Sequence, residues 1–399
     1  MTTAAPDEVR HGWPAILACF AVAVFAWGFG LYGQAVLLAG LRAERGWPTA
    51  LISSATTLYY LAGALVIAYA PRLIARHGPR RLLLGGALIL AAGASITANA
   101  AAPWEMFAGS LVMAAGWACT STTAIATTLA LWFDTRRGFA ISLALNGASA
   151  SGFTVAPLLV ATQQSIGLGN AVPLVAAALF AALAPLVLWG TARPMRDGAR
   201  PGTRPPPESG LWREPAFWHV ALPFAIGLVA QVALLVHLVA ILLPRLGPSG
   251  ASLGVALVSL MAMIGRIAAG TILTRLNLRR FSAASFVLQA AAVLLMTAQP
   301  SSAWAQIAGC IGLGLSVGNV ITLPSILIQR EFPPHRFGPV VGLSTAVGQV
   351  AYAFAPALAG LIHDAAGGYT QVLALCAALQ ILAACLVLPS RLFAPPTIR

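Results

Sequence analysis

The sequence predicts an all-α membrane protein with twelve transmembrane helices in two six-helix pseudo-symmetric bundles. Three observations lead to this fold class: the composition, the number of apolar runs, and a repeat that relates the two halves. Of the 399 residues, 59% are hydrophobic and only 8% are charged, whereas a soluble globular protein carries about 25% charged residues. That composition places the chain in a lipid bilayer, because charged side chains are costly in hydrocarbon.

Twelve apolar runs can be counted along the chain, and each is long enough to cross a bilayer core of about 30 Å as a helix. They lie roughly at residues 13–38, 48–70, 82–100, 103–131, 138–162, 170–190, 216–243, 249–273, 281–299, 303–328, 338–362 and 369–389. The first run is too long for the apolar region of a secretory signal and lacks a clear cleavage site. We therefore predict that it is a membrane span.

The longest polar stretch, residues 191–215, lies between the sixth and seventh runs. It is rich in Pro, Gly and Arg, a composition typical of linkers. We therefore predict a first six-helix bundle over residues 1–190, a cytoplasmic linker over 191–215, and a second six-helix bundle over 216–399.

The placement of the arginines predicts the orientation in the membrane. The chain has no lysine, so all 23 basic residues behind its net charge of +13 are arginines. Nineteen fall in segments on the same side as both termini, three fall on the opposite side, and Arg266 lies within a run. Basic residues accumulate on the cytoplasmic side, so we expect a multi-pass inner-membrane protein with both termini cytoplasmic. The same placement argues against nucleic acid as a partner.

The two halves repeat each other at matching loops. Residues 70–81 follow the second run and 270–280 follow the eighth, while "WFDTRRG" (132–138) and "EFPPHRFG" (331–338) follow the fourth and tenth. Parallel repeats are typical of transporters whose binding site lies between the repeats near the bilayer midplane. The basic residues of these loops are candidates for gating between the bundles, or alternatively for topology and contact with anionic lipid: Arg76, Arg80, Arg81, Arg136, Arg137, Arg275, Arg279 and Arg280.

These features together resemble the major facilitator superfamily. Segments 70–81 and 270–280 are similar to that family's loop signature, Gly-x-x-x-Asp-Arg-x-Gly-Arg-Arg, although Ala75 and Thr274 stand where the signature has aspartate. The resemblance covers essentially the whole chain and implies the major facilitator fold. The substitutions imply that the contact made by the family's aspartate between the bundles is weakened or replaced here.

Several stretches narrow the resemblance to the monocarboxylate-transporter-like branch of bacterial proteins. They are "ERGWPTALIS" (44–53), "WFDTRRGFAISLALNGAS" (132–149), "FW" (217–218), "GRIAAG" (265–270) and "GLIHDAAGGY" (360–369). In that branch an arginine in the eighth span is taken to meet the substrate carboxylate, and Arg266 falls at that position. Some members have an aspartate one turn before this arginine, where this chain has Ala262.

Arg266 is also the sharpest signal when the residues are considered by themselves, because a charge in a membrane helix costs about 3 kcal/mol on insertion scales. It lies nine residues before Arg275, or about 13 Å along a helix, in the inner-middle of the bilayer core. Its counterpart in the repeat is Ile67, so the common fold does not require an arginine there. A guanidinium matches a carboxylate in two-pronged geometry, and neither Asp nor Glu lies within forty positions. We interpret Arg266 as an anion-binding residue that faces a cavity; the alternative is that it reaches the inner interface or bonds backbone carbonyls.

The acidic residues favour an anionic cargo. None of the ten lies deep in a span, and only Glu105 and Asp364 lie near the outer face, whereas carriers of cations usually need a buried carboxylate. We therefore assign proton coupling to the bound anion, to His237 in the seventh span, or to Asp364 at the outer mouth. Histidine titrates near neutral pH, although His237 could instead be an interhelical hydrogen-bonding residue. His219 is interpreted as interfacial.

Neutral polar residues recur in the runs, where they either line a cavity or hydrogen-bond between helices. Besides Arg266, the candidates for substrate binding are Tyr32, Tyr59, Tyr60, Asn146, Asn319, Gln349 and Tyr352. The glycine-rich stretches 146–152 and 312–318 allow close helix contact, and we interpret them as packing or sliding surfaces.

The sequence thus predicts a secondary active transporter of a small organic anion, a monocarboxylate in the first instance. It would work by alternating access, as a symport with protons or by anion exchange. The alternative is an exporter of drugs or other lipophilic small molecules, in which Arg266 is structural. An enzyme is not expected, because no HExxH pattern and no soluble catalytic domain are found. We expect no cofactor and no metal, and partners limited to the anion, protons and the lipid bilayer, with a monomeric chain.

Overall fold

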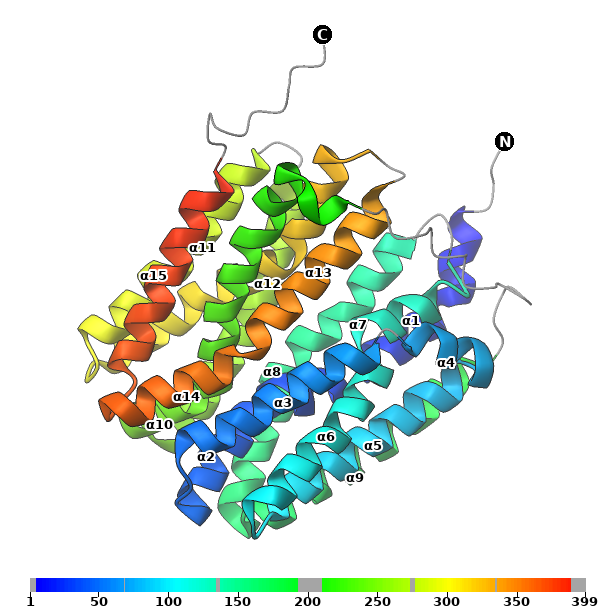
Figure 1. The fold of residues 1–399 in the computed structure, drawn as a ribbon. Helices are drawn as coiled ribbons and strands as arrows, with labels where there is room; N and C mark the ends of the chain where they lie inside the picture. Colours follow the sequence, from blue (N-terminus) through cyan, green and yellow to red (C-terminus); the bar gives the residue numbers. More distant parts are fainter. Residues whose placement is uncertain are drawn as a thin grey trace. The chain divides into compact units, whose positions relative to one another are not determined.

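The computed structural model describes residues 5–67, 69–133, 137–192, 210–272, 277–333 and 336–388. Its fold is all-α, as the sequence predicts (Figure 1). Within the described residues, ten helices are long and apolar enough to cross a membrane. The chain divides into two compact units, Met1–Trp47 with Leu58–Thr203, and Pro48–Thr57 with Arg204–Arg399.

The first unit holds the helices of the first six runs. They are α1 (Ala5–Trp27), the π-helical turn η1 (Gly28–Tyr32), α2 (Gly33–Arg45), the later part of α3 (Thr49–Ile67), α4 (Ala70–His77), α5 (Pro79–Asn99), α6 (Pro103–Thr120), α7 (Thr122–Leu129), α8 (Arg137–Ile166) and α9 (Leu168–Gly190). The end of α2 is set by Gly46, whose φ of 67° lies in the left-handed region that favours glycine.

The second unit holds the remaining helices together with the start of α3. They are the 3-10 turn η2 (Leu211–Arg213), α10 (Pro215–Ile272), α11 (Leu278–Ala298), α12 (Ala303–Glu331), α13 (Phe337–Ala353), α14 (Ala355–Ala366) and α15 (Thr370–Val387). The predicted linker falls largely on residues 193–209, which lie outside the described residues.

Two local features explain why ten long helices correspond to twelve predicted runs. The seventh and eighth runs form the two arms of α10, interrupted at Gly247, whose φ is 68°. A Cβ on Gly254 would lie 2.3 Å from the Leu242 side chain, so the arms fold back on each other at this turn. The fourth run is divided into α6 and α7 at Ser121, whose backbone is extended and whose hydroxyl caps the second helix by accepting from the Ala124 N–H.

Close helix contacts confirm that the two glycine-rich stretches are packing surfaces. A Cβ on Gly147 of α8 would lie 2.2 Å from the carbonyl oxygen of Phe20 in α1. A Cβ on Gly314 of α12 would lie 2.5 Å from the carbonyl oxygen of Val258 in α10. Small residues allow such backbone approach in membrane helices, where packing rather than the hydrophobic effect drives association.

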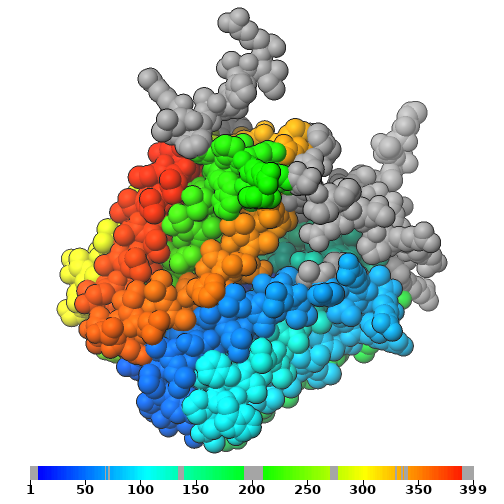
Figure 2. All heavy atoms as spheres, in the orientation of Figure 1, coloured from blue at the N-terminus to red at the C-terminus, as the bar shows by residue number. Residues whose placement is uncertain are grey.

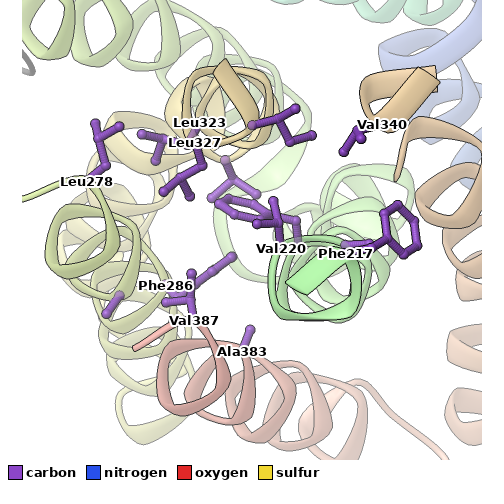
Figure 3. Close-up of a cluster of buried hydrophobic side chains, with 14 of the residues drawn as sticks. Phe217, Val220, Leu278, Phe286, Leu323, Leu327, Val340, Ala383 and Val387 are labelled. Atoms are coloured by element: carbon purple, nitrogen blue, oxygen red, sulfur yellow. The ribbon is translucent and has the colours of Figure 1, made fainter. Parts of the chain in front are cut away.

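An apolar cluster joins the helices at one end of the second unit (Figure 3). Its labelled members are Phe217, Val220, Leu278, Phe286, Leu323, Leu327, Val340, Ala383 and Val387. They come from α10, α11, α12, α13 and α15, so this cluster fixes the first arm of α10 among its neighbours. In the space-filling view, α14 and α15 form one continuous surface of this unit (Figure 2).

Candidate functional site

Arg266 lies on the second arm of α10, where that arm packs closely against α12. Its side chain is half-buried. A Cβ on Gly318 would lie 3.4 Å from the Arg266 Cβ and 2.3 Å from the carbonyl oxygen of Ala262, one turn earlier. A Cβ on Gly265 would lie 2.2 Å from the carbonyl oxygen of Leu315. These approaches hold the backbone of Arg266 against α12, so the guanidinium extends from a rigid base.

Asn319, which follows Gly318, belongs to the same helix contact. It is 5% exposed, and its Nδ2 donates to the carbonyl oxygen of Leu315 at 3.1 Å, the same oxygen that faces Gly265. Its Oδ1 is buried and has no hydrogen-bond partner among the described residues. A buried acceptor left in this way costs about 1–3 kcal/mol, which a bound donor would remove. Two of the predicted residues therefore lie on the contact between α10 and α12: Arg266, and Asn319 next to the glycine that faces Arg266.

Gln349 and Tyr352 lie on α13 of the same unit. Gln349 is 7% exposed, and its Nε2 is a buried donor without a hydrogen-bond partner in the described part of the chain. The preceding residue, Gly348, faces the Leu228 side chain of α10. Tyr352 is half-buried. The second unit therefore supplies a cation, a buried acceptor and a buried donor from three different segments.

Three predicted tyrosines pack around the π-helical turn of the first unit. Tyr32 ends this turn, and Tyr59 and Tyr60 lie on α3; all three are buried. The Tyr60 hydroxyl donates to the carbonyl oxygen of Gly30 at 3.3 Å. A Cβ on Gly30 would lie 2.4 Å from the Tyr59 hydroxyl oxygen and 2.5 Å from the Trp117 ring. A π-helical turn inside a membrane helix is often found at functional sites.

Asn146 is half-buried in α8 of the first unit, next to the packing residue Gly147. The predicted substrate-binding residues therefore fall into two groups. The first unit holds Tyr32, Tyr59, Tyr60 and Asn146, and the second unit holds Arg266, Asn319, Gln349 and Tyr352.

His237 is fully buried in the first arm of α10 and hydrogen-bonded on both ring nitrogens. Its Nε2 lies 3.1 Å from the carbonyl oxygen of Pro356 and 3.4 Å from the Ser53 hydroxyl, and its Nδ1 lies 2.9 Å from the Tyr369 hydroxyl. A carbonyl oxygen can only accept, so we assign the hydrogen of the neutral ring to Nε2. The Tyr369 hydroxyl then donates to Nδ1.

Asp364 lies at the end of α14 and reaches the start of α3. Its Oδ2 accepts from the backbone N–H of Ala50 at 2.7 Å, and its Oδ1 lies 2.8 Å from the His363 Nδ1. The Thr49 side chain also hydrogen-bonds to this carboxylate. The ring of Tyr369 packs against His363, with ring centroids 4.4 Å apart. The sequence indicated His237 and Asp364 but missed the residues that join them, Ser53, His363 and Tyr369.

Two of the candidate gating arginines hold equivalent helix ends. Arg80 donates from Nη2 to the carbonyl oxygen of Leu188 in the last turn of α9 at 2.9 Å. Arg279 donates from Nη1 to the carbonyl oxygen of Val387 at the end of α15, also at 2.9 Å. Arg279 further forms a two-pronged ion pair with Glu331, at 2.8 and 2.7 Å. Each arginine therefore joins helices within its own unit, at helix ends where a cation is favourable.

The other gating candidates are less informative. Arg76, Arg81 and Arg280 are exposed. Arg136 and Arg275 lie outside the described residues, as does the side chain of Arg137. A role for these loops in gating stays a prediction.

A chain of three buried glutamines, Gln231, Gln289 and Gln380, crosses the second unit. Gln289 donates to the Gln231 carbonyl oxygen at 3.0 Å, and Gln380 donates to the Gln289 carbonyl oxygen at 2.6 Å and to the Gly227 backbone at 3.1 Å. The glutamines come from α10, α11 and α15 and are at most 1% exposed. The signal was present in the sequence, since Gln289 and Gln380 each interrupt an apolar run.

Residues 314–318, "GLSVG", match the G-x-S-x-G pattern of hydrolase nucleophiles. That chemistry requires a sharp turn between a strand and a helix, whereas these residues lie within α12. The Ser316 hydroxyl donates back to the Leu313 carbonyl oxygen at 2.9 Å. The match is therefore part of the α10–α12 packing surface.

Comparison with known proteins agrees with this architecture. A family model described as Major Facilitator Superfamily matches residues 18–356. A bacterial homologue of the human lysosomal transporter Spinster, in an inward-facing and occupied conformation, superposes with a TM-score of 0.73 at 14% identity, covering 93% of this chain and 95% of that one. The nucleoside transporter NupG superposes with a TM-score of 0.76 at 11% identity, covering 94% and 98%. No curated protein shows a significant match to the chain. At these identities the solved structures show a common fold alone.

Proposed function

The chain belongs to the major facilitator superfamily of membrane transporters, and we propose that it carries a small organic anion whose carboxylate binds Arg266. The observation that carries this proposal is the position of that arginine. It lies inside a membrane helix, on the contact between α10 and α12 that also holds the buried Asn319. Its repeat counterpart is Ile67, so the fold itself has no need of the charge. A bound anion would offset the cost of keeping a cation at this depth.

The chemistry of the neighbouring groups suits a carboxylate. A guanidinium offers two parallel N–H donors to one carboxylate, and the glycine contacts of α12 fix the backbone from which it extends. The buried Asn319 Oδ1 is available to a donor on the cargo or to a bridging water. A charge-assisted hydrogen bond contributes about 1.5–3 kcal/mol, which corresponds to roughly tenfold to hundredfold in affinity.

We propose a monocarboxylate as the cargo class, because Arg266 is the one arginine of the sequence that falls within an apolar run. The stretches that resemble the monocarboxylate-transporter-like branch support the same class. The transporter would work by alternating access, with proton symport or anion exchange. The arginine placement supports an inner-membrane location with cytoplasmic termini, and we propose that the monomer is the working unit.

The test is uptake of a panel of labelled carboxylates into proteoliposomes, with and without a pH gradient. Wild type should accumulate at least one monocarboxylate. Arg266→Lys keeps the charge but loses the two-pronged geometry, so it should weaken apparent affinity at least about tenfold. Arg266→Ala should abolish uptake while the protein still inserts and unfolds at a similar temperature.

Arg245 provides a matched control in the same helix. It is half-buried like Arg266, and its Nη1 donates to the Gln306 side chain at 2.9 Å. Arg245→Ala should lower thermal stability and leave the apparent affinity for the anion within about twofold. Unchanged affinity in Arg266→Ala would make the arginine structural, and transport of lipophilic compounds would then become the better hypothesis.

A further inference from the structure

The start of α3, which belongs to the second unit, contacts α14 along one face. Ala50, Ser53 and Thr57 follow the spacing i, i+3 and i+7, which places them on the same side of a helix. Each of these three residues contacts a residue of α14. These contacts define a seam, which we name the α3–α14 seam, consisting of residues 49–57 and residues 357–364.

The seam consists of polar groups and one glycine. The Ala357 N–H donates to the Thr57 hydroxyl oxygen at 3.2 Å. A Cβ on Gly360 would lie 2.8 Å from the Ser53 hydroxyl oxygen and 2.9 Å from the Ala50 Cα, so the two backbones touch here. Asp364 accepts from the Ala50 N–H at 2.7 Å. Hydrogen bonds between neutral groups in membrane helices contribute little each, so the charged carboxylate is the strongest contact of the seam.

Asp364 also acts as the cap of a helix to which it does not belong. The first N–H groups of α3 have no partner within the helix, and a carboxylate is favourable at this positive end. Protonation would remove the negative charge and one acceptor site, so the cap should be strong for the carboxylate and weak for the acid.

The titratable groups that face this carboxylate are few among the described residues. His363 on α14 contacts Asp364 directly. Tyr369, ahead of α15, packs against the rings of both His363 and His237, with centroids 4.4 and 5.5 Å apart. His237 on α10 contacts Ser53 of α3. Protonation of His363 would strengthen its pairing with the carboxylate, so the seam should weaken only when the carboxylate itself takes up a proton.

We propose that the α3–α14 seam is an acid-released latch, in which protonation of Asp364 frees the first turns of α3 from α14. The latch gives a proton a specific place to act on the transporter. It does not depend on which cargo is carried, and the test uses the protein without cargo. The proposal therefore stands or fails separately from the role of Arg266.

The test is hydrogen–deuterium exchange of the full chain in lipid nanodiscs, with protection factors corrected for the intrinsic effect of pH. In wild type, amides 49–57 should be protected at pH 7.5 and should lose protection at least about tenfold in acid. Asp364→Asn mimics the protonated acid, so these amides should exchange at pH 7.5 as wild type does in acid, with no further pH dependence. His363→Gln removes a donor that favours the carboxylate, so the transition should move to higher pH.

Glu44 supplies a control with the same chemistry in the first unit. Its Oε1 accepts from the Leu168 N–H at the start of α9, at 2.8 Å. Glu44→Gln should raise exchange near Leu168 and leave amides 49–57 unchanged. Burial by itself would raise the pKa of Asp364, but the hydrogen bonds from Ala50, His363 and Thr49 outweigh it and hold that pKa below its usual value. Release should therefore come only at a pH below the ordinary carboxyl range of about 4. Protection of amides 49–57 that stays flat throughout that more acid range, while the chain remains folded, would overturn the latch, and this measurement needs no variant to fold. Wild-type protection in Asp364→Asn at pH 7.5 would overturn it as well.

Discussion

The two units treat corresponding positions of the repeat in two different ways. Arg80 and Arg279 do the same work, because each donates to a carbonyl oxygen in the last turn of its unit's final helix, α9 or α15. Ile67 and Arg266 also correspond, yet one is apolar and the other is charged. Positions with one role in both units belong to the fold. Positions where the units differ in charge are the places to look for cargo binding.

The interiors of the two units also differ in polarity. Around η1 the first unit packs aromatic rings, with the centroids of Tyr59 and Trp117 6.1 Å apart. The second unit instead runs a chain of amides through Gln289. Leu90, ten residues after Arg80, stands where the second unit has Gln289, ten residues after Arg279. The repeated helical fold therefore tolerates either an apolar or a hydrogen-bonded side chain at this interior position.

The largest effect should come from replacing Arg266 of the second unit by isoleucine, the residue at the corresponding position of the first unit, Ile67. Arg266→Ile, like Arg266→Ala, should abolish measurable uptake at low carboxylate concentrations, since losing about 1.5–3 kcal/mol of charge-assisted bonding lowers affinity roughly tenfold to hundredfold. Thermal stability in lipid should stay the same or rise, because the cost of a charge in a membrane helix is removed. Uptake and thermal unfolding should be measured on the same preparation. A large loss of stability with unchanged uptake would reverse the interpretation of this position.

A smaller effect should separate the two arginines that do the same work. Arg279→Ala removes a backbone bond and leaves Glu331 without its two-pronged partner, so it should destabilise the protein by about 1.5–3 kcal/mol. Arg80→Ala should cost about 1 kcal/mol, as expected for a single hydrogen bond. Reversible unfolding in mixed micelles measures both variants. Equal losses would mean that the ion pair with Glu331 adds nothing in the second unit.

The smallest effect is expected in the amide chain. Gln289→Leu copies Leu90 of the first unit and removes two hydrogen bonds, each worth about 0.6 kcal/mol in membrane helices. We expect a loss of about 1 kcal/mol in the unfolding free energy, with transport unchanged. Gln380→Leu also removes two hydrogen bonds, one to Gln289 and one to the Gly227 backbone, so it should cost a similar amount. A gain in stability in either variant would show that an apolar side chain, as found in the first unit, also packs better than the glutamine in the second unit.

The sequence by itself determined the environment and the helical spans. Apolar composition is summed residue by residue along a run, so the bilayer location and most helix positions follow without knowledge of any contact. The same holds for Arg266, since a lone charge in an apolar run stands out whatever lies beside it. The glycine-rich stretches could also be predicted as packing surfaces from the sequence alone. Close backbone approach needs small residues whichever helix is the partner.

Only the tertiary structure decided which polar groups meet. Asp364 and Ala50 are 314 positions apart, and His237 and Ser53 are 184 apart, so no spacing along the chain could pair them. The break of the fourth run at Ser121 was hidden for a related reason. Hydropathy is additive and local, and it records how much of a segment lies in lipid. Hydrogen bonding is pairwise and depends on direction, so its partners are fixed only once the helices have packed.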